Sequence, residues 1–343
     1  GIKSVAVGFE SQIAQTTGNR NTTLGYRTMY TADGGEDFNT VIGSEAGYYI
    51  NNDASHDNVI IGKNALQGGT GTALGNVAIG SGAMEAIGNN NQTGTISIGT
   101  DSLKALNSGT DNVAIGYQAG LAITTSNQNT IIGYQALKEH VGGGSNVAIG
   151  PNAMDQTAGT NAATSAYNIA IGRDALGGDW ADATSNSNVA IGVFAMDAVM
   201  NDADNNVAVG YNSLSELTTG DNNTAVGKDA LSAVTTGTHN VAVGGRCGDA
   251  LVDGDYNVFL GEFAGSTTTS VNNAVFIGQS AGAGADVSAD GAIGIGLSAL
   301  GVLTSGAGST VIGYQAGDAI TSGDYNTAIG YQALSTEDTG DRN

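Results

Sequence analysis

The chain has 343 residues, of which 55 are glycine and one is proline, and its 32 acidic and 10 basic side chains give a net charge of −22. This composition excludes collagen, which needs abundant proline, and the 40% apolar and 12% charged residues disfavour disorder. The acidity disfavours nucleic acid and anionic membrane surfaces as partners, and without an apolar run of about 18 residues we expect no membrane insertion of this segment.

A short motif, Asn-Val-Ala-Ile-Gly, recurs with variations from one end of the chain to the other. Its closing glycine occurs 19 times, and ten of the 18 intervals are 17 residues, while the others run from 18 to 22. The closing glycines are Gly8, Gly25, Gly43, Gly62, Gly80, Gly99, Gly116, Gly133, Gly150, Gly172, Gly192, Gly210, Gly227, Gly244, Gly261, Gly278, Gly296, Gly313 and Gly330. We therefore expect residues 1–343 to form a single repeat array without a second kind of domain.

The three residues before each closing glycine, from 5–7 to 327–329, read as a short strand. The first is Val, Ile or Thr and the third Val, Ile or Leu in all 19 copies, whereas the middle one is small in 13. β-Branched residues favour strands, and a period of two places the large and small side chains on opposite faces. We expect the large residues to fill the inside of a coil and the small ones to allow close approach on the other face. Phe259 and Phe276 interrupt this small column.

Turn residues follow each strand. The closing glycine permits a corner with positive φ, and a pair such as Ala136-Leu137 then begins a second inward stretch. Segments 218–223, 253–257 and 322–326 are rich in Gly, Asn and Asp, which tight turns accept. A 17-residue unit of this kind has no room for an ordinary helix. The sequence therefore predicts an all-β, parallel β-solenoid of about 19 coils.

Asparagine stands four residues before the closing glycine in 14 copies. Stacked coils bring equivalent residues together, so these side chains should form a ladder in which each bonds to the next coil. The expected ladder includes Asn112, Asn146, Asn206, Asn240 and Asn326.

The motif resembles the head repeat of YadA-like trimeric autotransporter adhesins, which also occurs in bacteriophage tail fibres. The resemblance rests on Asn-Val-Ala-Ile-Gly at 112–116, 146–150 and 188–192 and on 326–334, and it covers essentially the whole chain. It implies a left-handed β-roll, a homotrimer and attachment to surfaces. The units here are longer than the usual head repeat, and the segment lacks the neck, stalk and membrane anchor of an autotransporter. We therefore expect part of a longer fibre, with further subunits associating end to end.

No residue pattern indicates catalysis. Cys247 falls in a column occupied by Ala and should be a packing residue, and His239 should be a solvated turn residue. Asp111, Asp221, Asp255 and Asp324 in the turns are weak candidates for Ca²⁺, because each turn supplies one carboxylate. We therefore expect no resident cofactor, with Ca²⁺ as an open alternative.

Two aromatic features are candidates for receptor contact. Tyrosine follows the closing glycine in six copies and should stack as a column, which can cover a corner or bind sugar faces. These residues are Tyr26, Tyr117, Tyr134, Tyr211, Tyr314 and Tyr331. The longest intervals, ending at Gly172 and Gly192, contain the only tryptophan. We expect an exposed Trp180, flanked by Asp179 and Asp182, to contact the receptor.

These observations favour a non-enzymatic fibre segment, extracellular on a cell surface or a virion, that binds itself and a surface receptor or glycan. Two alternatives remain open. An enzyme on a β-helix needs clustered catalytic side chains that interrupt the repeat, and an ice-binding solenoid needs a flat outer column of Thr.

Overall fold

A computed structural model describes residues 3–86, 88, 90–157, 164–181, 183–283, 290–336 and 338–343. Contacts divide the chain into two compact units, Gly1–Arg173 (unit 1) and Asp174–Asn343 (unit 2). Both units are all-β and contain no α-helix among these residues, and the same ranges hold no helix that is long and apolar enough to cross a membrane. Both are built from the predicted repeat, while one continuous array over 1–343 stays a prediction.

Each repeat contributes one three-residue strand immediately before its closing glycine. Unit 1 contains β1 (Val5–Val7), β2 (Thr22–Leu24), β3 (Thr40–Ile42), β4 (Val59–Ile61), β6 (Val77–Ile79), β8 (Ile96–Ile98), β9 (Val113–Ile115), β10 (Thr130–Ile132), β11 (Val147–Ile149) and β12 (Ile169–Ile171), and a separate pair, β5 (Ala73–Leu74) with β7 (Gln92–Thr93). Unit 2 contains β13 (Val189–Ile191), β14 (Val207–Val209), β15 (Thr224–Val226), β16 (Val241–Val243), β17 (Val258–Leu260), β18 (Val275–Ile277), β19 (Ile293–Ile295), β20 (Thr310–Ile312) and β21 (Thr327–Ile329).

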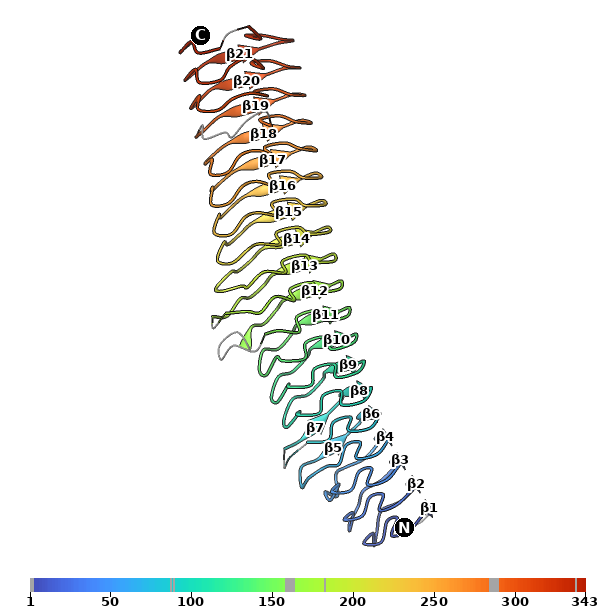
Figure 1. Cartoon of the computed structure of the whole chain (residues 1–343). Coiled ribbons are helices and arrows are strands. Elements are labelled where there is room, and N and C mark those ends of the chain that lie inside the picture. Colours follow the sequence, from blue (N-terminus) through green and yellow to red (C-terminus); the bar gives the residue numbers. More distant parts are fainter. Residues whose placement is uncertain are drawn as a thin grey trace. The chain divides into compact units, whose positions relative to one another are not determined.

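Within each unit, strands of successive coils pair in parallel, one coil apart (Figure 1). Val113 of β9 lies opposite Thr130 of β10, and Val207 of β14 lies opposite Thr224 of β15. Equivalent residues of neighbouring repeats therefore stack directly on one another. The predicted parallel β-solenoid is confirmed.

The strands face the opposite way from our expectation. The middle residue is buried in every repeat strand except β1, and the β-branched residues on either side of it are partly exposed. Ala148 in β11 and Ala225 in β15, for example, have no exposed surface. The small column thus lines the inside of the coil, and the large residues form an outer face.

The middle residue of each strand lies close to the residue three positions after the closing glycine. In unit 1 the hydroxyl of Ser97, at the centre of β8, lies 2.6 Å from that of Ser102, three residues after Gly99. In unit 2 the Ser213 hydroxyl donates to the Ala225 carbonyl oxygen at 3.2 Å. Both of these positions therefore hold small side chains in most coils, whereas large interior residues such as Met84 and Leu103 stand one position later.

Large residues enter the interior where glycine makes room for them. The rings of Phe259 and Phe276 are fully buried and stacked, with centroids 5.6 Å apart. A Cβ added to Gly265 would lie 2.9 Å from the Phe259 ring, and one added to Gly282 would lie 2.6 Å from the Phe276 ring. The phenylalanines therefore occupy the volume that Leu or Met fills in other coils.

Candidate attachment surface and the ladders behind it

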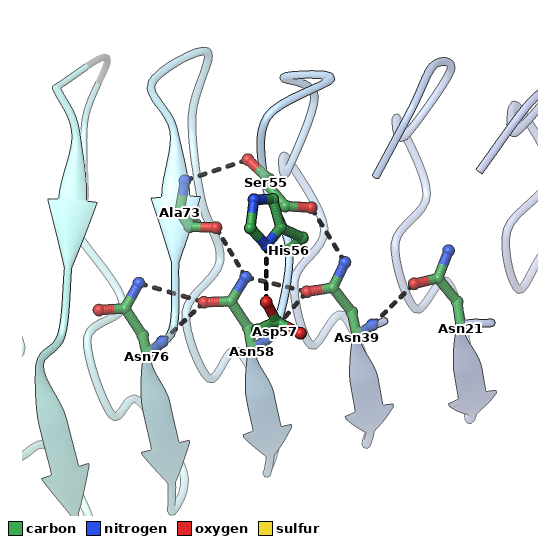
Figure 2. A network of polar contacts seen from close by, with 8 residues as sticks. All are labelled: Asn21, Asn39, Ser55, His56, Asp57, Asn58, Ala73 and Asn76. Atoms are coloured by element: carbon green, nitrogen blue, oxygen red, sulfur yellow. Dashed lines mark hydrogen bonds and ion pairs between the residues drawn. The ribbon is translucent and has the colours of Figure 1, made fainter. Parts of the chain in front are cut away.

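The asparagines form a buried ladder, as predicted (Figure 2). Figure 2 shows Asn21, Asn39, Asn58 and Asn76, one from each of four successive coils. The backbone N–H and the side-chain amide of Asn76 both donate to Oδ1 of Asn58, at 2.9 and 3.1 Å. Asn58 donates in the same way to Asn39, and its Nδ2 also donates to the Ala73 carbonyl oxygen at 2.7 Å.

The same pattern continues in the other predicted members. Asn146 and Asn206 each donate their backbone N–H to the preceding asparagine at 2.9 Å, and Asn240 does so at 3.0 Å. Asn326 donates instead to the hydroxyl of Ser309 at 3.1 Å. Each rung satisfies polar groups that the coil has removed from water, so the ladder stabilises the corner before most strands.

Replacing Asn223 by alanine should lower the free energy of unfolding by about 1 to 2 kcal/mol, because Asn240 then loses the Oδ1 that accepts its N–H and Nδ2 (3.0 and 3.1 Å). The Gly237 carbonyl oxygen also loses its donor. The neighbouring residue Asn222 is exposed and has φ of +59°, so Asn222→Gly is the matched control. Urea unfolding of both variants checks this, and equal losses would contradict the prediction.

A second ladder stands two residues earlier, six before the closing glycine, and runs in the opposite direction. Oδ1 of Asp221 accepts the backbone N–H of Asp204 at 2.7 Å, and Oδ1 of Asp255 accepts that of Thr238 at 2.7 Å. Asn272 accepts the N–H of Asp255 at 2.9 Å. Here the earlier coil donates to the later side chain, whereas in the asparagine ladder the later coil donates to the earlier one.

This second ladder gives most of the acidic turns a structural role that our sequence reasoning missed. Asp221, Asp255 and Asp324 belong to it, since Asp324 accepts the N–H of Ala307 at 2.9 Å. Asp111 stands one residue later in its coil and accepts the Thr110 hydroxyl at 3.2 Å. Within the described ranges, no group of three or more His, Cys, Asp or Glu side chains is arranged to hold a metal ion. The calcium alternative therefore finds no ligand set there.

The outer strand face is an exposed, largely apolar surface in each unit. It consists of the first and third residues of every repeat strand, and none of them is buried. Ile132 of β10 is 36% exposed and Val243 of β16 is 42% exposed. Large apolar patches on soluble proteins mark contact surfaces, so this face is the candidate surface for contact with a second chain.

Tyrosines border this face just after the closing glycines. The rings of Tyr117 and Tyr134 stack at 5.5 Å, and those of Tyr314 and Tyr331 stack at 5.4 Å, which confirms the predicted column at these coils. Tyr26 stacks on Phe9 at 5.7 Å instead. Tyr211 meets Phe194 edge to face at 6.0 Å.

The expectation of an exposed Trp180 is wrong. The side chain is 2% exposed, because this long repeat folds its large ring inward, and the indole Nε1 has no hydrogen-bond partner. Asp179 is exposed beside it, whereas Asp182 lies outside the described residues. A rim contact through the tryptophan ring is therefore not available in this arrangement.

Cys247 and His239 occupy the environments that we expected. Burial raises the pKa of the Cys247 thiol to about 12, and Sγ donates to the Phe259 carbonyl oxygen at 3.0 Å, so the residue packs as a neutral thiol. His239 is exposed in its turn and stacks on Tyr256 at 4.8 Å.

Comparison of the chain with protein-family models and with curated proteins finds no match. The similarity to adhesin head repeats therefore rests on the residues of the motif alone. Any proposal about function has to be carried by the fold and by the outer strand face.

Proposed function

We propose that this chain is a non-enzymatic attachment segment of an extracellular fibre, on a cell surface or a virion, and that it works as a homotrimer. The observation that carries the proposal is the outer strand face, which presents two β-branched columns in both units. A coil interior can cover only one face of its strands, and here it covers the face with the small residues. Burying the other face requires a second surface, and the resemblance of the repeat to trimeric adhesin heads supplies the stoichiometry.

The same geometry suits attachment. Coils that stack in register present each surface position once per repeat, so contacts that are weak singly act together when a partner meets several of them. The two ladders contribute rigidity, since their bonds tie many coils to both neighbours. A receptor or glycan on the target surface is the partner that the proposal requires.

Light scattering on the purified chain tests the assembly. We expect a mass near three times the 34.0 kDa of one chain. Replacing Val226 and Val243 by lysine should shift the mass toward the monomer, because an interface that buries these positions must desolvate two unpaired charges per chain.

The control places lysine at Thr219 and Thr236, which are exposed in the turns of the same two coils. This variant carries the same added charge and should keep the parent's mass. A parent that is a stable, soluble monomer contradicts the proposal, as does an equal shift in the two lysine variants.

A further inference from the structure

A groove of about 310 Å³ opens on unit 1 beside Tyr49, and none of its lining residues belongs to a repeat strand. Its lining includes Thr31, Tyr49, Asn51, Gly68, Gly69 and Thr70. The volume lies at the lower end of the range for small-molecule sites. Neither the attachment proposal nor the sequence pattern assigns a role to this groove.

One wall of the groove is an aromatic ring held in place by other rings. Tyr48 stacks on Tyr30 with centroids 4.9 Å apart, and Tyr49 meets Tyr48 edge to face at 4.5 Å. The Tyr49 backbone N–H donates to the Gln67 carbonyl oxygen at 2.5 Å. The Tyr49 side chain is nevertheless 50% exposed, so the ring offers a fixed, accessible surface. A ring held in this way loses little conformational entropy when a ligand binds.

The floor of the groove is glycine because a side chain does not fit there. Gly68 stands six residues after Gly62, as Tyr49 stands six after Gly43, so it is the equivalent residue of the next coil. A Cβ on Gly68 would lie 2.8 Å from the Ile50 backbone nitrogen. The space beside the Tyr49 ring therefore stays open at the position of Gly68. In the tyrosine column, by contrast, the rings of Tyr117 and Tyr134 cover one another.

The rim consists of uncharged hydrogen-bonding groups. The Thr31 hydroxyl donates to the Tyr48 carbonyl oxygen at 3.0 Å. The side-chain amide of Asn51 donates from Nδ2 to Asp33 Oδ1 at 2.5 Å and to the Thr31 carbonyl oxygen at 3.3 Å. The hydroxyl-bearing Thr70 is exposed on the same rim. The nearby Asp33 carboxylate and the chain's net charge of −22 disfavour an anionic ligand.

An exposed aromatic ring beside neutral donors and acceptors matches one ligand chemistry in particular. A pyranose ring has an apolar C–H face that packs on an aromatic ring and hydroxyls around its edge that reach polar neighbours. We propose that the Tyr49 groove binds a neutral hexopyranose residue of a glycan. This site does not involve the outer strand face, so the proposal of sugar binding is tested separately from the proposal of a homotrimer.

Saturation-transfer NMR on the full chain tests the groove, with methyl β-D-galactopyranoside and methyl α-D-glucopyranoside as probes and N-acetylneuraminic acid as the anionic comparison. We expect transfer to the ring C–H protons of at least one neutral glycoside. Tyr49→Ala should weaken that binding about tenfold. Tyr49→Phe keeps the ring, so its affinity for the glycoside should stay within about twofold of the parent's. Tyr256→Ala removes a tyrosine of similar exposure in unit 2 and should leave sugar binding unchanged.

Thr70→Leu provides a second variant that keeps Tyr49 and places a branched side chain on the rim. It should also weaken binding, with circular dichroism and light scattering unchanged from the parent. The proposal is overturned if neither glycoside receives saturation, if Tyr256→Ala loses as much as Tyr49→Ala, or if the anionic sugar binds more tightly than the neutral ones. A variant that loses sugar binding but keeps the parent's mass separates this result from failure of the homotrimer.

Discussion

Replacing Gly227 by alanine is expected to destabilise unit 2 by about 3 to 5 kcal/mol. Gly227 has φ of +139°, which alanine adopts only with strain, and an added Cβ would lie 2.3 Å from the Gly244 carbonyl oxygen. That oxygen belongs to the backbone of the next coil, where the Gly244 N–H donates to the Val226 carbonyl oxygen at 2.8 Å. The oxygen cannot move away without disturbing this strand pairing.

Gly245→Ala is the matched control, because it adds the same methyl group one position after the next closing glycine. A Cβ at Gly245 has no atom within 4 Å, and its φ is not positive. We expect a change within about 0.5 kcal/mol for this variant. Urea unfolding of the two proteins at equal concentration measures the difference, and similar losses would show that the closing glycines are not needed for coil contact.

The positions of the strands could be predicted because the repeat interval determines the register. Once Gly116 and Gly133 are equivalent, Val113 must lie opposite Thr130, and the structure pairs them. The asparagine ladder followed from the same reasoning, since residues at one offset stack. The second ladder carried a comparable signal, Asp or Asn six residues before many closing glycines. Taken one turn at a time, these residues indicate only weak candidates for Ca²⁺, and the ladder becomes visible when residues at one offset are compared from coil to coil.

The direction in which the strands face could not be derived from the alternation of large and small residues. That alternation is the same whichever face is buried, and the choice depends on how closely the opposite wall of the coil approaches. The contact between Ser97 and Ser102 shows this approach in one coil of unit 1. Local residue preferences do not contain this information.

The aromatic sites show a similar limit. A long interval around Trp180 indicated inserted residues, but an insertion can fold over the coil or away from it, and a large apolar ring favours the covered position. The groove beside Tyr49 depends on which residue of the next coil lies next to that ring. The repeat interval makes Gly68 the equivalent residue of the next coil, but only the structure shows that a groove opens there.

His140 is the one histidine that is buried among the described residues, in a position that hydrophobic residues such as Leu217 and Leu251 fill in other coils. Nε2 lies 3.0 Å from the Gly143 backbone nitrogen and 3.2 Å from the Gly143 carbonyl oxygen, and Nδ1 lies 3.1 Å from the Thr157 hydroxyl. The remaining neighbour, Asn146 at 3.5 Å, is neutral as well. With no carboxylate among these contacts, burial lowers the pKa of His140 to about 4.

The stability of unit 1 should therefore decrease as the pH falls. An unfolded chain protonates this histidine below a pKa of about 6.5 and the folded chain does not, so its contribution is complete above that pH and is lost toward pH 4. Relative to His140→Leu, the parent should lose about 2 kcal/mol between pH 7.5 and 5, and about 3 kcal/mol by pH 4. Burial raises the pKa values of Glu36 and Asp249, which acts in the opposite direction, but both variants contain these residues and the difference cancels them. Urea unfolding from pH 7.5 to 5 measures the two curves, with His239→Gln as the exposed control, and parallel curves for the parent and His140→Leu would show that His140 is not held neutral in the fold.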